Sequence, residues 1–274
     1  MSEQTFYRGS VGGRGVVLAV SHLPAGSAEA LTQGLAFAKF IPKPARGKKP
    51  ALTIEVAGTA ASAMATADAP SQPASQGAAT SFQRDLTPEI RLCADLAARR
   101  ALFQVALHAD ATLWLPRVRS EILHLFGLFT PTLALHASCV VTKKEKSGWV
   151  FCGPSGAGKT TISTVLLKAL PLVDEEIVLV DLSTAAPQIL NTPSAGPPLA
   201  IAGLFQLKQA AACSVEKLSS GEFIAKNMTR PFNLAMPEFL NERMEKLAKL
   251  TEALRPRELR FNLHTYELLG ALGC

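Results

Sequence analysis

The chain has 274 residues, of which 48% are hydrophobic and 18% are charged. That composition excludes a chain disordered throughout, which would be poor in apolar residues, and the length allows one large domain or two small ones. The 28 basic side chains outnumber the 22 acidic ones by six, but aromatic residues make up only 6%. Much of the excess lies in one loop, so the charge does not predict nucleic-acid binding. The basic residues of that loop are Lys43, Arg46, Lys48 and Lys49.

The cysteines and the longest uncharged stretch bear on the compartment. The five cysteines have no CxxC or zinc-like spacing, and no secretory signal is visible, so we expect a reducing, cytoplasmic location. The stretch from Ile122 to Thr142 has no charged side chain and is long enough to raise a membrane span. Its pattern changes from helical to strand-like around Pro131, however, and two buried elements joined by a turn explain it better. We therefore expect no membrane contact.

Residues 1–100 predict a small α+β region interrupted by an insertion. The expected elements are a strand over 16–20, a helix over 28–40 and a strand over 51–56. From 57 to 81 the chain is mostly Ala, Ser, Thr, Gln, Gly and Pro, with Asp68 as its single charge. Such a composition cannot bury a core, so it predicts a flexible insertion across which the flanking strands could pair.

Residues 101–274 mix strands and helices from end to end, which predicts an α/β domain. The predicted elements are strands over 101–107 and 111–115, a helix over 117–126, a strand over 133–141, a charged hairpin turn over 143–148, a strand over 149–152, a helix over 160–170, strands over 177–182 and 199–207, helices over 219–229 and 237–254, a strand over 260–263 and a helix over 265–272.

One motif carries clear chemistry. Residues 153–160 match G-x-x-x-x-G-K-[ST] between an apolar strand and a helical pattern. In such a P-loop the backbone N–H groups and the helix N-terminus face phosphate oxygens, the lysine reaches the β- and γ-phosphates and the hydroxyl ligates Mg²⁺. No guanine-reading N-K-x-D motif follows, so we expect ATP with Mg²⁺. The expected nucleotide-binding residues are Gly153, Pro154, Ser155, Gly156, Ala157, Gly158, Lys159, Thr160 and Thr161.

An acidic group is also needed, to hold Mg²⁺ or to accept a proton, and two candidates follow the P-loop. Asp174-Glu175-Glu176 precedes the next predicted strand, and Asp181 ends that strand as the acid of a Walker B strand does. Three adjacent carboxylates could equally be a solvated strand end.

The surroundings of the motif resemble a known family. Leu135-His136-Ala137-Ser138 precedes the P-loop, and the acidic cluster follows about sixteen residues after Lys159. With the segments 197–207 and 215–219 and the later Arg260-Phe261, this pattern is similar to the C-terminal catalytic domain of HPr kinase/phosphorylase and its HPr kinase-like relatives, over about residues 100–274. Two glutamates stand where that family has two aspartates, and its glycine-rich segment after them is absent.

The resemblance implies a fold similar to the nucleotide-binding domain of phosphoenolpyruvate carboxykinase, and γ-phosphoryl transfer from ATP to a serine hydroxyl of a protein or peptide. Glu175 would accept the hydroxyl proton, Lys159 would neutralise the transferred charge, and His136 would lie near the phosphates. Thr160 with Glu176 or Asp181 would hold Mg²⁺.

Other interpretations stay open. His136 could be a core histidine bonded to backbone. The whole chain could be a nucleotide-binding regulatory module, or a small-molecule kinase of the same fold. The resemblance also implies a homo-oligomer.

Overall fold

The computed structural model describes residues 5–11, 14–23, 26–35, 41–42, 50, 52–59, 81–142, 147–167, 172–174, 176–190, 197–228, 237–262 and 265–272. The chain divides into two compact units, Met1–Thr130 and Pro131–Cys274. The predicted boundary between residues 100 and 101 is therefore wrong. Strand β7 (Arg100–Ala106) pairs with two strands of the first unit, and helix α3 (Ala111–Phe129) packs on the same sheet.

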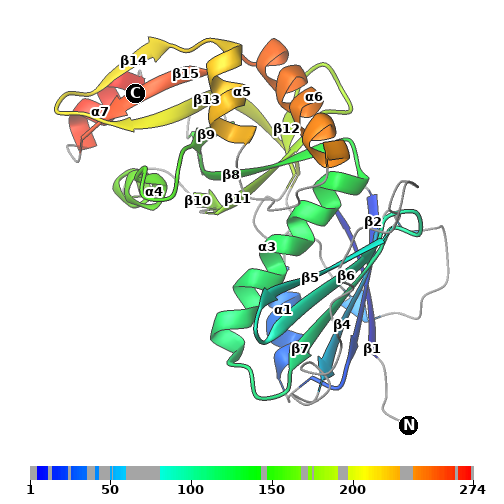
Figure 1. Cartoon of the computed structure of the whole chain (residues 1–274). Coiled ribbons are helices and arrows are strands. Elements are labelled where there is room, and N and C mark those ends of the chain that lie inside the picture. The colour runs from blue at the N-terminus through cyan, green and yellow to red at the C-terminus, as the bar shows by residue number, and fades with distance from the viewer. Residues whose placement is uncertain are drawn as a thin grey trace. The chain divides into compact units, whose positions relative to one another are not determined.

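The N-terminal unit is one mixed seven-stranded sheet in the order β3-β1-β2-β4-β7-β6-β5. Strands β2, β4 and β7 are parallel at its centre, and the outer strands pair antiparallel. Helices α1 and α3 pack against each other, and α3 also packs against β4 (Figure 1). The remaining bounds are β1 (Thr5–Val11), β2 (Arg14–Ser21), α1 (Ser27–Gly34), β3 (Ile41–Pro42), β4 (Leu52–Thr59), β5 (Ser81–Thr87) and β6 (Ile90–Asp95).

The strands on the two sides of the predicted insertion, β4 and β5, lie in one sheet but are separated by β7 and β6. The antiparallel β5–β6 hairpin was not predicted. Residues 60–80 of the insertion, the basic loop over 43–49 and the charged residues 143–146 lie outside the described part of the chain.

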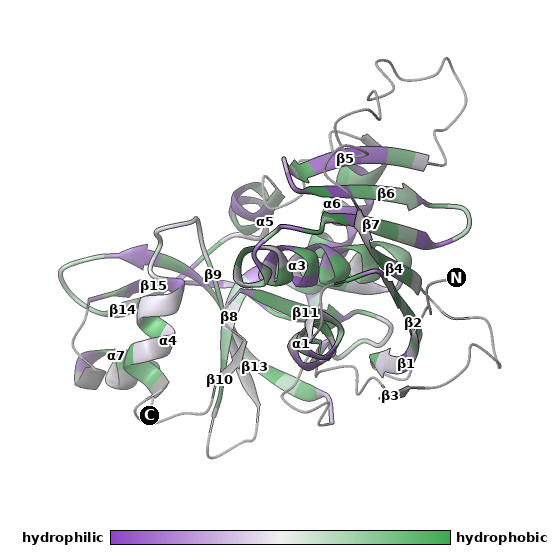
Figure 2. Cartoon of the chain, turned by 90° about the horizontal axis from the view of Figure 1, so that it is seen from below, coloured by the Kyte–Doolittle hydropathy of each residue, from purple (hydrophilic) through white to green (hydrophobic). Residues whose placement is uncertain are grey.

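The predicted strand over 111–115 is wrong, because α3 begins at Ala111 and runs through Pro116 to Phe129. The Asp110 carboxylate accepts a hydrogen bond of 2.8 Å from the Thr112 backbone N–H and so caps the helix. Hydrophilic and hydrophobic residues alternate around this helix (Figure 2). The uncharged stretch from Ile122 to Thr142 is the end of α3 followed by strand β8 (Thr132–Val141), which confirms two buried elements joined at Pro131.

The C-terminal unit is built on a mixed eight-stranded sheet whose pairings close on themselves. Strand β8 pairs with β9 and β11, β13 pairs with β9 and β12, and β12 pairs with β11. The other strands are β9 (Gly148–Cys152), β10 (Leu172–Asp174), β11 (Ile177–Asp181), β12 (Gln188–Ile189), β13 (Leu199–Gln209), β14 (Ser214–Lys217) and β15 (Arg257–Phe261).

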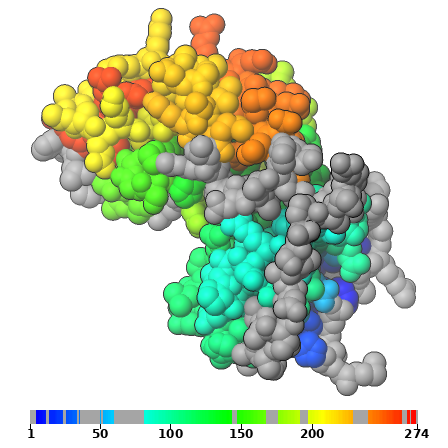
Figure 3. Space-filling model, viewed as in Figure 1, coloured from blue at the N-terminus to red at the C-terminus, as the bar shows by residue number. Residues whose placement is uncertain are grey.

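Both faces of this sheet carry an apolar core, which explains why β9 is an unbroken apolar run. Val150 and Cys152 pack on one face in a cluster that includes side chains of α5 (Ser220–Met228) and α6 (Pro237–Ala253). Trp149 and Phe151 pack on the other with side chains of the remaining helices, α4 (Lys159–Leu167) and α7 (Thr265–Leu272). Figures 1 and 3 show α5 and α6 side by side on this unit.

Both units are thus mixed α/β, and the predicted fold class is confirmed at that level. Among the described residues, no helix is long and apolar enough to cross a membrane.

Candidate functional site

The P-loop connects β9 to α4 in the C-terminal unit, as the sequence predicts. Strand β9 ends at Cys152, and α4 begins at Lys159. Since the first backbone N–H groups of a helix have no partners within it, those of α4 point toward the loop. The tip of the loop, residues 154–156, is exposed, as are Thr160 and Thr161 at the start of the helix. This arrangement is the strand, loop and helix that phosphate binding requires.

Two glycines give the loop its curvature. Gly156 has φ of 80° and Gly158 has φ of 95°, both in the left-handed region that side chains disfavour. Such an alternation of backbone conformation turns successive N–H groups toward a common centre and makes an anion-binding concavity. A third glycine is required by space alone: a Cβ on Gly153 would lie 2.7 Å from the Ala157 Cβ.

Lys159 lies over the loop with 7% of its surface exposed. Its Nζ donates hydrogen bonds of 3.0 Å to the carbonyl oxygens of Gly153 and Pro154. The charge is therefore held at the start of the loop by dipoles of the loop itself. Burial raises the pKa of the neighbouring Cys152 thiol to about 12, against the opposing effect of the Lys159 and Arg243 charges. The thiol is neutral at physiological pH, so it cannot neutralise the lysine.

Three side chains outside the motif hold the loop. The Ser138 Oγ donates to the Lys159 carbonyl oxygen at 3.2 Å, which anchors the first residue of α4 to β8. The Gln209 Nε2 donates to the Gly156 carbonyl oxygen at 3.2 Å. The Phe261 ring packs so closely that a Cβ on Gly158 would lie 2.6 Å from its Cζ. Ser138 and Phe261 belong to the segments that resemble the HPr kinase-like family, whereas nothing in the sequence singles out Gln209.

His136 lies on β8, and its Nδ1 is 3.1 Å from the Glu176 backbone oxygen. A carbonyl oxygen only accepts hydrogen bonds, so Nδ1 is the donor and carries a proton. This contact is the one expected if His136 is a histidine bonded to backbone, the alternative interpretation given by the sequence. The bond also fixes the ring beside the start of β11. A role near phosphate stays a prediction.

The strand register places the acidic candidates. Ala137 is opposite Cys152 in β9, and its N–H donates to the Glu176 oxygen at 3.0 Å, so these three residues lie level across the sheet. The Glu176 backbone is therefore two strand spacings, about 10 Å, from the end of β9. Asp181 lies five residues farther along β11, about 16 Å beyond that level. The geometry favours Glu176 over Asp181 as the metal ligand. Glu175, the predicted base, lies outside the described residues.

Within the part of the chain that the structure describes, no three His, Cys, Asp or Glu side chains gather as metal ligands. The Asp181 carboxylate accepts a hydrogen bond of 3.0 Å from the Ser183 N–H, which is a local turn contact. An exposed hydroxyl at Thr160 with one carboxylate at Glu176 fits Mg²⁺, because this ion takes one or two protein ligands and completes its shell with water and phosphate oxygens.

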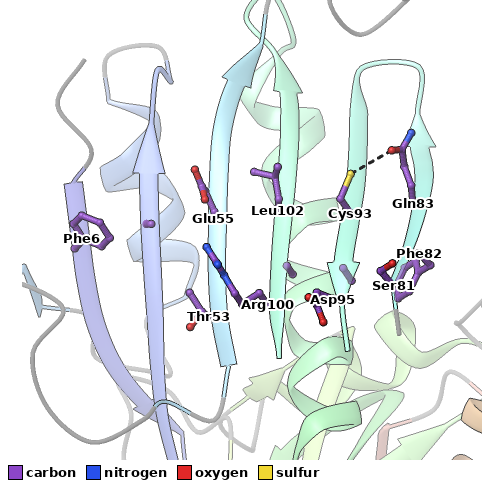
Figure 4. Close-up of a pocket in the computed structure, with 13 residues that line it drawn as sticks. Phe6, Thr53, Glu55, Ser81, Phe82, Gln83, Cys93, Asp95, Arg100 and Leu102 are labelled. Atoms are coloured by element: carbon purple, nitrogen blue, oxygen red, sulfur yellow. Dashed lines mark hydrogen bonds between the residues drawn. The ribbon is translucent and has the colours of Figure 1, made fainter. Parts of the chain in front are cut away.

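The N-terminal unit has a hollow of about 730 Å³ on its sheet (Figure 4). Glu55, Arg100 and Leu102 face it from the parallel strands β4 and β7, with helices behind the sheet. On the antiparallel side, Cys93 Sγ is 3.7 Å from Gln83 Oε1. The lining of this hollow mixes one basic, two acidic and several apolar side chains, so the hollow favours no ligand class. Sequence reasoning named none of these residues.

In comparisons with protein-family models and with curated proteins, no match to this chain was found.

Proposed function

We propose that the C-terminal unit binds ATP and Mg²⁺ at the P-loop and transfers the γ-phosphoryl group to a serine hydroxyl of a protein or peptide. One observation carries the binding half of this proposal. The loop between β9 and α4 combines two left-handed glycines with a buried lysine at the helix N-terminus. Each of these features favours a polyphosphate. A simple turn between a strand and a helix would need neither the two left-handed glycines nor the buried lysine.

The transfer half rests on the family resemblance, including its fold, which is that of the phosphoenolpyruvate carboxykinase nucleotide-binding domain. Lys159 would neutralise charge that develops on the transferred group. Glu175 would accept the serine proton as its oxygen attacks phosphorus and the bond to the ADP oxygen breaks. Thr160 and Glu176 would hold Mg²⁺, which supplies further charge neutralisation on the phosphates. His136, fixed through Nδ1, would present its other ring nitrogen to the phosphates or the acceptor.

Labelled ATP tests the proposal. Purified chain is incubated with γ-labelled ATP, Mg²⁺ and either the protein fraction or the small-molecule fraction of a cell extract. The proposal predicts label on protein serine, lost in Lys159→Met and in Glu175→Gln. Lys217→Met is the matched control, because Lys217 is an exposed lysine on β14 of the same unit and should leave transfer unchanged.

Each other outcome identifies a different function. Label in a metabolite contradicts a protein substrate and favours a small-molecule kinase. ATP binding without transfer favours a regulatory module. Transfer that persists in Lys159→Met overturns the site itself.

A further inference from the structure

A series of hydrogen-bonded polar side chains, two of them buried and one half-buried, lies behind the P-loop strand, on the face covered by α5 and α6. Gln206 of β13 is 2% exposed and is level with Cys152 in the parallel β9. The Asn227 Nδ2 of α5 donates to the Gln206 Oε1 at 2.9 Å and to the Phe223 carbonyl oxygen at 2.8 Å. Because Oε1 is engaged, the Gln206 amide turns its Nε2 toward the loop, 3.8 Å from where a Gly153 Cβ would stand.

Arg243 of α6 continues this series. Its Nε and Nη2 donate to the Asn227 carbonyl oxygen at 3.2 and 3.0 Å. Its Nη1 donates to the Ala134 carbonyl oxygen at 3.1 Å. We name Gln206, Asn227 and Arg243 the amide–arginine relay. It connects the strand beside the P-loop to the strand that carries His136, through residues 37 positions apart in sequence.

The acceptors of the guanidinium are unusual for a half-buried cation. They are backbone carbonyl oxygens, and in the described part of the chain no carboxylate forms an ion pair with Arg243. Desolvation lowers the pKa of Arg243 to about 10, which leaves it charged at neutral pH. A desolvated cation without a counter-ion is costly, and an anion that binds nearby recovers that cost.

The position of this charge points to the phosphate loop. Pairing between β8 and β9 begins at Ala137 and Cys152, so Ala134 lies on the part of β8 that extends past the end of β9. Arg243 reaches Ala134 there, alongside the beginning of the loop. The charges of Lys159 and Arg243 both lower the pKa of the Cys152 thiol against the effect of burial. Both cations therefore lie near the end of β9.

We propose that Arg243 is a positioning residue of the phosphate site, and that its charge, held by the amide–arginine relay, strengthens the binding of a polyphosphate at the P-loop. This inference rests on the proposed function and extends it beyond the motif. The ligand class is a chain of phosphates, so inorganic tripolyphosphate should respond as ATP does. The competing explanation is that Arg243 only ties α5 to β8.

The test compares dissociation constants of ATP·Mg²⁺ and of inorganic tripolyphosphate by titration calorimetry. Arg243→Met should weaken both about tenfold or more, whereas Arg243→Lys keeps the charge and should recover most of the loss. Arg255→Met is the matched control, since Arg255 is exposed in the same unit. If Arg243→Met binds both ligands as the wild type does while Lys159→Met does not, the inference is overturned and the proposed function stands.

A second variant decides the matter if Arg243→Met does not fold. Gln206→Glu has the same shape and places a carboxylate in the amide–arginine relay, beside the start of the loop. It should weaken tripolyphosphate binding about tenfold relative to wild type at pH 8, and the ratio should return toward one as the pH is lowered through the pKa of the new carboxylate. A ratio that does not change with pH shows a structural role alone and overturns the inference. If the wild type binds neither ligand, the proposed function fails first.

Discussion

Gly158 is the tightest point of the P-loop and the best place to test its geometry. Its φ is 95°, and an added Cβ would lie 2.6 Å from Phe261 Cζ. Alanine costs about 1–2 kcal/mol in the left-handed region. Displacing a buried ring costs about 1–3 kcal/mol more. We expect Gly158→Ala to lower the free energy of unfolding of the C-terminal unit by about 2–5 kcal/mol.

Gly156 provides the matched control. Its φ is 80°, and no atom lies within 4 Å of an added Cβ. Gly156→Ala should therefore cost only the conformational part, about 1–2 kcal/mol. Urea unfolding followed by the fluorescence of Trp149, which is 7% exposed in β9, measures both variants. A Trp114→Phe background removes the signal of the N-terminal unit.

A double-mutant cycle isolates the ring. Phe261→Leu leaves a cavity of its own, but in Gly158→Ala it should recover part of the loss, because the shorter side chain makes room for the new methyl group. If Gly158→Ala costs no more than Gly156→Ala, or if Phe261→Leu adds its full cost in both backgrounds, the close packing of ring and loop is refuted.

Two further predictions concern titratable groups of the same unit. Burial alone would raise the pKa of Glu258, but the hydrogen bond from Arg260 and the charges of Lys208 and Lys226 outweigh it and lower the pKa. The stability that this carboxylate contributes is present above about pH 4.3, the ordinary value, and is lost as the pH falls through the lowered pKa. Glu258→Gln should therefore lower the free energy of unfolding by about 1 kcal/mol at pH 7 and make its decrease toward acid pH less steep. Glu252→Gln, at an exposed site, should change neither quantity. An unchanged dependence on pH in Glu258→Gln contradicts the account. For Cys152, whose pKa burial raises to about 12, a thiol reagent at pH 8 should modify it far more slowly than the half-buried Cys213, as mapped by mass spectrometry. Equal rates would show that the end of β9 is open to solvent.

Local patterns predicted the elements around the P-loop, because there each residue's neighbours in sequence are also its structural context. An apolar run, the glycine-rich motif and a helical stripe are sufficient for β9, the loop and α4. The α3 error had a local cause too. Pro116 lies between the predicted strand and the predicted helix, but in the structure it is in the second turn of α3, where the cap at Asp110 and the buried face beyond it outweigh one missing N–H.

The pairing of strands that lie far apart in the chain could not be predicted from the sequence. The boundary at Thr130 depends on β7 joining a strand more than forty residues earlier, and register across a parallel pair has no local signal. The same limit applies to the site. Gln206, Asn227 and Arg243 are ordinary surface residue types in their own segments, and only the packing of α5 and α6 on β8 and β13 brings them together.

The central claim is that this P-loop binds a nucleoside triphosphate, and calorimetric titration of the purified chain with ATP·Mg²⁺ tests it most directly. The account predicts one site per chain, lost in Lys159→Met and kept in Lys217→Met, whose lysine is exposed on β14. Absence of binding to the wild type, or equal binding to the wild type and to Lys159→Met, would contradict it.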